Sequence, residues 1–127
     1  MRLATHRPPG LVLTDHRFTV PLDHGDPGGE TIEIFAREMV APARERDELP
    51  WLLFLQGGPG FESPRPLGRD ETWKERALAD WRILLLDQRG TGRSTPQNRR
   101  TLAALGTPQR QADHLAHFRA DNIVRDA

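Results

Sequence analysis

Apolar residues form two short uninterrupted runs along this chain, at Trp51–Leu55 and at Ile83–Leu86. Uninterrupted runs of this length are typical of parallel strands covered on both faces, whereas half-exposed strands alternate between apolar and polar residues. We therefore expect both segments to be central parallel strands. Between them, Asp70–Asp80 has acidic residues in its first turn and places Trp73, Ala77 and Leu78 on one face, which predicts a crossover helix.

An antiparallel hairpin is predicted before these strands. Phe18–Leu22 and Thr31–Val40 alternate in character and flank Asp23–Gly29, a segment rich in turn-forming residues. Pro21 cannot donate a hydrogen bond to a ladder, so the first of these strands is expected at an edge of the sheet. The fold class predicted is α/β, with an antiparallel hairpin followed by parallel strands and a crossover helix.

Helices are also predicted towards the carboxyl end. Thr107 followed by Pro108 is a favourable helix start, with threonine as the cap and proline in the first position. Apolar residues between Ala112 and Val124 then recur at mixed helical spacing, which indicates two helices. Neither a glycine cap nor a closing turn follows at Asp126–Ala127, so we expect this chain to be the amino-terminal part of a longer domain.

The segment Gln56–Gly60 carries the most specific chemistry of the sequence. Gly57 and Gly58 follow a buried strand and lack a Cβ, so a substrate carbonyl can approach their backbone N–H groups closely. Pro59 stiffens the turn and donates nothing itself. Free N–H groups in such a loop can stabilise a negatively charged oxygen, which makes an oxyanion hole the functional hypothesis. The alternative is a glycine-rich turn that only ends the strand.

A second motif, Asp87–Ser94, reads Asp-Gln-Arg-Gly-Thr-Gly-Arg-Ser and follows the second apolar run. In this order, Gly57–Gly60 and Asp87–Ser94 resemble the His-Gly-Gly-Pro-Gly and Asp-Gln-Arg-Gly-x-Gly-x-Ser elements of proline iminopeptidases, which have the α/β-hydrolase fold. Phe118–Asp126 resembles the next helix of that family. The likeness extends from about Phe18 to the last residue.

The resemblance implies roles for individual residues. Gly58 would supply an oxyanion-hole N–H and Gly57 would permit the turn, with Gln56, Pro59 and Gly60 completing the substrate-pocket loop. Gln56 stands where the family usually has histidine, but backbone donors do not depend on that side chain. Three residues of the second motif, Asp87, Arg89 and Gly90, would hold a structural loop that walls the active site.

Three other functional hypotheses have less support from the sequence. Ser94 resembles a nucleophile, but Pro96 stands where a nucleophile elbow needs a small residue. A dinucleotide site at Gly90–Gly92 lacks the third glycine of its fingerprint. A metal site from His114, His117 and Asp121 is geometrically conceivable, but we expect a solvated helix face or a lid contact there and no metal.

Two more histidines, His16 and His24, lie near the predicted hairpin and have no evident carboxylate partner in the sequence. None of the five histidines stands where the family has its catalytic base, and no cofactor is expected.

Length and composition limit the remaining possibilities. The 127 residues fit a single domain, residues 1–127, but a complete α/β-hydrolase needs roughly twice this length. Lys plus Arg and Asp plus Glu are 18 each, so nothing indicates nucleic-acid or membrane binding. Cysteine is absent, which excludes thiolate nucleophiles. No signal-peptide-like or membrane-spanning run is present, so a cytoplasmic location is expected.

The function expected from the resemblance is a serine aminopeptidase that releases amino-terminal proline from peptides. This chain would supply the oxyanion-hole loop and not the catalytic triad, and would be inactive by itself. The alternatives are a related α/β-hydrolase, such as an esterase, epoxide hydrolase or haloalkane dehalogenase, and a truncated, catalytically inactive product. The expected partner is a peptide with a free amino-terminal proline.

Overall fold

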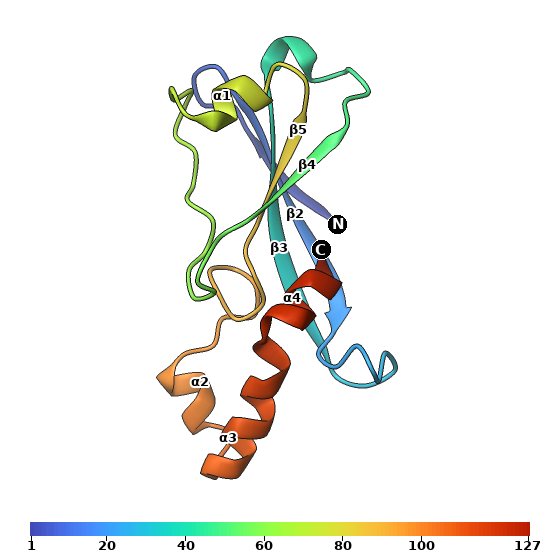
Figure 1. Ribbon diagram of the computed structural model, residues 1–127, viewed down its shortest axis with the longest axis vertical. Coiled ribbons are helices and arrows are strands. Elements are labelled where there is room, and N and C mark those ends of the chain that lie inside the picture. Colours follow the sequence, from blue (N-terminus) through green and yellow to red (C-terminus); the bar gives the residue numbers. More distant parts are fainter.

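The computed structural model describes all residues from Met1 to Ala127 and is built on one mixed sheet of five strands in the order β1-β2-β3-β5-β4. The first four in this order are antiparallel neighbours, and β5 and β4 are parallel. Figure 1 shows helix α1 at one end of the sheet and helices α2, α3 and α4 towards the other. The strands are β1 (Arg2–His6), β2 (Val12–Pro21), β3 (Thr31–Val40), β4 (Trp51–Leu55) and β5 (Arg82–Leu86).

The predicted hairpin is confirmed as β2 and β3, which pair from Val12↔Val40 to Pro21↔Thr31. The prediction that the first strand lies at an edge holds for the predicted residues from Phe18 on, but it is wrong for the first half of β2, because β1 pairs with Leu13–His16 on the other side. This additional pairing ends near Arg17, whose N–H donates to the Met1 carbonyl at 2.8 Å. Pro21 lies beyond that point, so its missing N–H is not needed by any neighbouring strand.

The parallel pair is confirmed in register from Trp51↔Arg82 to Leu55↔Leu86, but only β5 is central. The prediction that both strands are central is wrong for β4, which is an edge strand of this sheet. The side chains of β4 alternate between partly buried and exposed. Leu52 and Phe54 pack against the core, whereas Trp51, Leu53 and Leu55 are exposed because no strand or helix of this chain covers them.

Helix α1 (Trp73–Ala77) joins β4 to β5 and is shorter than the predicted Asp70–Asp80. It begins late because the Thr72 side chain caps it by accepting a hydrogen bond from the Lys74 N–H at 3.3 Å. Its predicted apolar face is observed, since Ala77 packs against the core and the Trp73 ring lies 5.2 Å from that of Phe54. The mixed sheet with its crossover helix confirms the α/β class.

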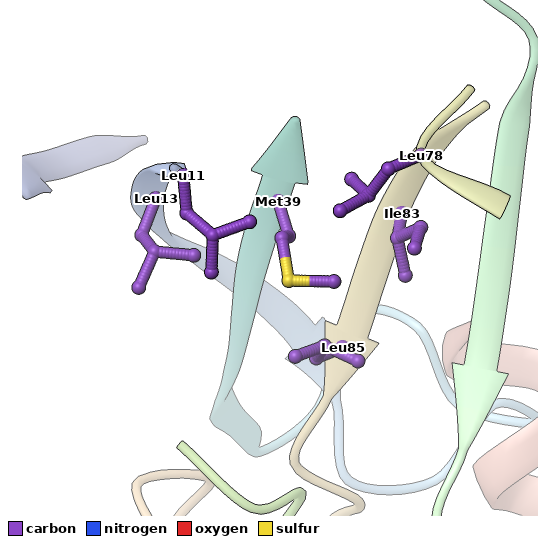
Figure 2. Close-up of a cluster of buried hydrophobic side chains, with 6 residues drawn as sticks. All are labelled: Leu11, Leu13, Met39, Leu78, Ile83 and Leu85. Carbon is purple, nitrogen blue, oxygen red and sulfur yellow. The ribbon is translucent and has the colours of Figure 1, made fainter. Parts of the chain in front are cut away.

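One core cluster lies between α1 and the sheet. Figure 2 shows its side chains pointing into a common space from β2 and the residue before it, from β3 and β5, and from the residue that ends α1. Burying these side chains stabilises the fold by roughly 1.5–3 kcal/mol for each large aliphatic residue. The members are Leu11, Leu13, Met39, Leu78, Ile83 and Leu85.

The region after β5 contains the short helices α2 (Arg99–Ala103), α3 (Pro108–Leu115) and α4 (Ala120–Asp126), with a 3₁₀ turn at Ala116–Phe118. The predicted helix start is confirmed, because the Thr107 hydroxyl accepts a hydrogen bond from the Arg110 N–H. Phe118 packs against a second core cluster, formed by Leu22, Ile32, Ile34, Ala36 and Leu86. None of the helices is both long and apolar enough to cross a membrane.

Candidate functional site

The loop after β4 presents unpaired backbone donors. The N–H groups of Gly57 and Gly58 have no hydrogen-bond acceptor in the chain, and both residues are exposed. Gly58 has a φ of +125°, a value that L-residues with side chains rarely adopt, and the Gly58–Pro59 peptide bond is cis. Two free N–H groups at the carboxyl end of a parallel strand are suited to bind an anionic oxygen.

A groove of about 600 Å³ lies beside this loop. Among the residues predicted for the site, Gln56 and Asp87 line the groove, whereas Gly57, Gly58, Pro59 and Gly60 lie outside its lining. The other lining residues come from β3, the segment after the loop and the Asp87–Ser94 segment, and are Phe35, Arg37, Phe61, Glu62, Ser63, Pro64, Arg65, Gly92 and Arg93.

Asp87 holds the wall of this groove together. Its carboxylate accepts one hydrogen bond from the Ser63 N–H at 3.1 Å and one from the Arg93 N–H at 3.0 Å. Burial raises the pKa of Asp87, against the opposing effect of these two N–H groups. Gly92 must lack a side chain here, because a Cβ would come within 2.3 Å of the carboxylate oxygen.

Ser94 is fully buried and is not accessible to a substrate. Its hydroxyl donates to the Asp87 carbonyl at 2.5 Å and accepts from the Phe35 N–H at 2.7 Å. These two bonds tie the Asp87–Ser94 segment to β3. Ser94 is therefore a structural residue and not the nucleophile of this chain.

Arg89 joins three distant segments from a position outside the groove. Its guanidinium forms a buried ion pair with Asp126, with nitrogen-to-oxygen distances of 2.6 and 2.7 Å. It also donates to the carbonyls of Leu22 at 2.7 Å and His117 at 2.8 Å. Gly90 follows in a backbone conformation that favours glycine, with φ +85°. This contact network fixes the Asp87–Ser94 segment to the hairpin and to α4.

Two histidines have carboxylate partners that sequence reasoning missed. The Nε2 atom of His16 lies 2.8 Å from a Glu38 oxygen, and that of His24 lies 2.8 Å from an Asp126 oxygen. The expectation that His16 and His24 have no carboxylate partner is therefore wrong. The first pair is diagonal across β2 and β3, and the second joins residues 102 positions apart, so neither is visible as a local motif.

The helical histidines have other neighbours. His114 contacts the Gln97 side-chain oxygen at 3.1 Å through Nε2, and its ring lies 5.0 Å from that of Phe118. No group of three or more histidine, aspartate or glutamate side chains is placed to hold a metal ion.

A charge cluster around the buried Asp15 carboxylate, at the wall of the groove, was also not predicted from the sequence. Arg37 donates to Asp15 at 2.7 and 3.2 Å, and Arg93 donates to the same carboxylate at 3.0 Å. Burial alone raises the pKa of Asp15, but the hydrogen bonds and charge of Arg37, with the bond from Arg93, outweigh it and lower the pKa below its ordinary value. The alternation within β2 and β3 could have placed Asp15 and Arg37 on one face, but it could not have identified them as partners or brought Arg93 to them.

We expect Asp15→Asn to lower the free energy of unfolding at pH 7 by about 2 kcal/mol, because a charged hydrogen-bond acceptor of two arginines is lost. A carboxyl group with a lowered folded-state pKa stabilises the fold above its unfolded pKa, and this contribution disappears as the pH falls through the folded pKa. The variant should therefore lose less stability than wild type on acidification. Urea unfolding between pH 7 and pH 2 measures both effects.

Glu33→Gln is the matched control, because the Glu33 side chain is 44% exposed, its ion pair with Arg17 is 3.8 Å long, and a glutamine oxygen can still accept the hydrogen bond from the Thr19 hydroxyl. Its effect should stay within about 0.5 kcal/mol at pH 7. An Asp15→Asn variant with the acid sensitivity of wild type would contradict this account of the cluster.

Comparison with known proteins identifies relatives over nearly the whole chain, although no protein-family model matches it. The chain is 57% identical over 119 residues to a proline iminopeptidase of Aeromonas sobria, covering 93% of this chain and 28% of that protein. It is 46% identical over 125 residues to the proline iminopeptidase aneH of Aspergillus aculeatus, covering 96% of this chain and 28% of that protein. The chain thus spans about 28% of these relatives' length, and the resemblance inferred from its two motifs is confirmed.

Proposed function

From its relationship to proline iminopeptidases, we propose that this chain is the amino-terminal part of a serine aminopeptidase that releases amino-terminal proline from peptides. The match to two proline iminopeptidases is the observation that carries this proposal. The free N–H groups of Gly57 and Gly58 give the chain a specific role within such an enzyme, because hydrolysis of an amide passes through a tetrahedral intermediate with an anionic oxygen.

The residues of this chain decide which catalytic groups it can supply. The chain contains no Gly-x-Ser-x-Gly elbow, so the serine nucleophile, histidine base and aspartate would come from other parts of the full-length protein. The serine would attack the carbonyl carbon of the amino-terminal proline, and the carbonyl oxygen would gain the negative charge. The Gly58 N–H, with that of Gly57, would stabilise this oxygen. The Asp87–Ser94 segment would support the wall of the site.

Two other functions remain open as alternatives. A related esterase, epoxide hydrolase or haloalkane dehalogenase could use the same fold, and the chain could also be a truncated product without catalysis. Assay of the full-length protein on proline naphthylamide and on nitrophenyl esters distinguishes these classes. The proposal expects a much higher kcat/KM on the proline amide. Preference for the esters would favour the esterase, and no turnover of either would favour another class or an inactive protein.

We expect no detectable peptidase activity from residues 1–127 alone. An oxyanion hole without a nucleophile retains at most a small part of the rate enhancement of a complete triad enzyme. The purified chain and the full-length protein should be compared on a proline arylamide at equal molar concentration. Turnover by the chain at a rate near that of the full-length protein would mean that a nucleophile within residues 1–127 was overlooked.

A further inference from the structure

Gln88 is a buried side chain that contacts the proposed oxyanion loop. It follows Asp87 directly after β5, and it is 5% exposed. Its Nε2 donates a hydrogen bond to the backbone carbonyl of Gln56, the residue before Gly57. Its Oε1 is the one buried side-chain polar atom of the chain without a hydrogen-bond partner. The side-chain amide of Gln88 therefore donates a hydrogen bond within the chain but accepts none.

This contact fixes the direction of one peptide group. The peptide between Gln56 and Gly57 is trans, and in a trans peptide the C=O and N–H point in opposite directions. Because Gln88 holds the Gln56 carbonyl towards the end of β5, the Gly57 N–H must point away from Gln88. A carbonyl oxygen only accepts hydrogen bonds, so the amide nitrogen, and not Oε1, has to face it.

We propose that Gln88 is a positioning residue that keeps the first N–H of the Gly57–Gly60 loop directed towards the substrate. This inference rests on the proposed peptidase function and deepens it. If the peptide turned over, the Gly57 N–H would point at Gln88, where a side-chain oxygen could accept it. The side-chain amide of Gln88 holds the observed direction through its N–H donor. A carboxylate can hold only the turned-over direction, because it has no donor.

Substitutions at Gln88 in the full-length protein test this role. Gln88→Met keeps the approximate side-chain length, removes the donor and also removes the unpartnered oxygen. We expect kcat on a proline arylamide to fall at least about tenfold, because misplaced groups around the reacting atoms reduce rate steeply. KM should change less than about threefold, since the loop acts on the transition state. The thermal midpoint should stay within about 2 °C of wild type.

Gln88→Glu provides a second, independent readout. Its carboxylate should favour the turned-over peptide, so kcat should fall below that of Gln88→Met. A protonated carboxyl group can donate as the amide does, so the ratio of its kcat to that of wild type should rise as the pH is lowered. Gln97→Met is the matched control, because Gln97 donates to the Thr95 carbonyl at 3.2 Å in the same region and does not contact the Gln56 carbonyl. It should leave kcat within about twofold of wild type.

The outcomes separate this inference from the proposed function. If wild type cleaves the proline amide and Gln88→Met and Gln88→Glu both retain its kcat, the inference is overturned. It is equally overturned if kcat falls only in proportion to a lowered thermal midpoint, as for a purely structural residue. If wild type cleaves only nitrophenyl esters, the proposed function fails, and the same kcat ratios measured on the ester still decide the role of Gln88.

Discussion

Replacing Gly58 with valine is expected to lower kcat of the full-length protein on a proline arylamide by about 10²-fold or more, the usual loss when one oxyanion donor is removed. Gly58 has a φ of +125°, and a Cβ there would lie 3.0 Å from the backbone nitrogen of Gly60. A branched side chain would therefore force the loop to move and would shift the N–H away from the developing charge.

Two control variants show whether a loss of kcat is specific to the position of Gly58 in the loop. Gln56→His introduces the residue that proline iminopeptidases usually carry and should be far less damaging. Gly28→Val makes the same chemical change in the turn between β2 and β3, where a Cβ would meet nothing within 4 Å. It should leave kcat within about threefold of wild type. A properly folded Gly58→Val variant with kcat that close to wild type would exclude Gly58 from the oxyanion hole.

Arg89→Met should lower the free energy of unfolding of the 127-residue chain by about 3–5 kcal/mol, because it leaves the buried Asp126 carboxylate without its arginine partner and with only the His24 ring beside it. The side chains of Arg89 and Asp126 are 0% and 1% exposed. The substitution also removes the donors to the Leu22 and His117 carbonyls. Urea unfolding followed by tryptophan fluorescence measures the change.

Arg76→Met is the control for this substitution, because Arg76 is 79% exposed and pairs with Asp80 on the surface of α1. Its effect should remain within about 0.5 kcal/mol. A loss of less than 1 kcal/mol for Arg89→Met would mean that the buried pair is not what attaches α4 to the sheet.

Strands β3, β4 and β5 and the second half of β2 were predictable because their signal is local, whereas β1 and the first half of β2 were not predicted. The apolar runs gave both parallel strands, and the turn-forming residues between Phe18 and Thr31 gave the hairpin. The sheet order was not predictable in the same way. Pro21 restricts only its own N–H, and the position of β1 on the other side of β2 depends on pairing that Pro21 does not influence.

The candidate site was predictable only in part, because only some of its features depend on neighbouring residues in the sequence. Glycine spacing indicated a turn at Gly57–Gly60, and among these three glycines only Gly58 has a backbone conformation that favours glycine. The contact of Gln88 with the Gln56 carbonyl and the contacts of Arg89 with Leu22 and Asp126 join residues 32 to 67 positions apart. The sheet brings these partners together, so no motif of neighbouring residues could reveal them.

A structure of the full-length protein with a prolyl boronate bound to its nucleophile tests the central claim most directly, because the boronate carries a negatively charged oxygen like that of the tetrahedral intermediate. The account predicts that this oxygen lies about 2.7–3.1 Å from the Gly58 nitrogen, with the Gly57 N–H on the same side of the loop. A boronate oxygen held by other groups, with both glycine N–H groups directed elsewhere, would contradict it.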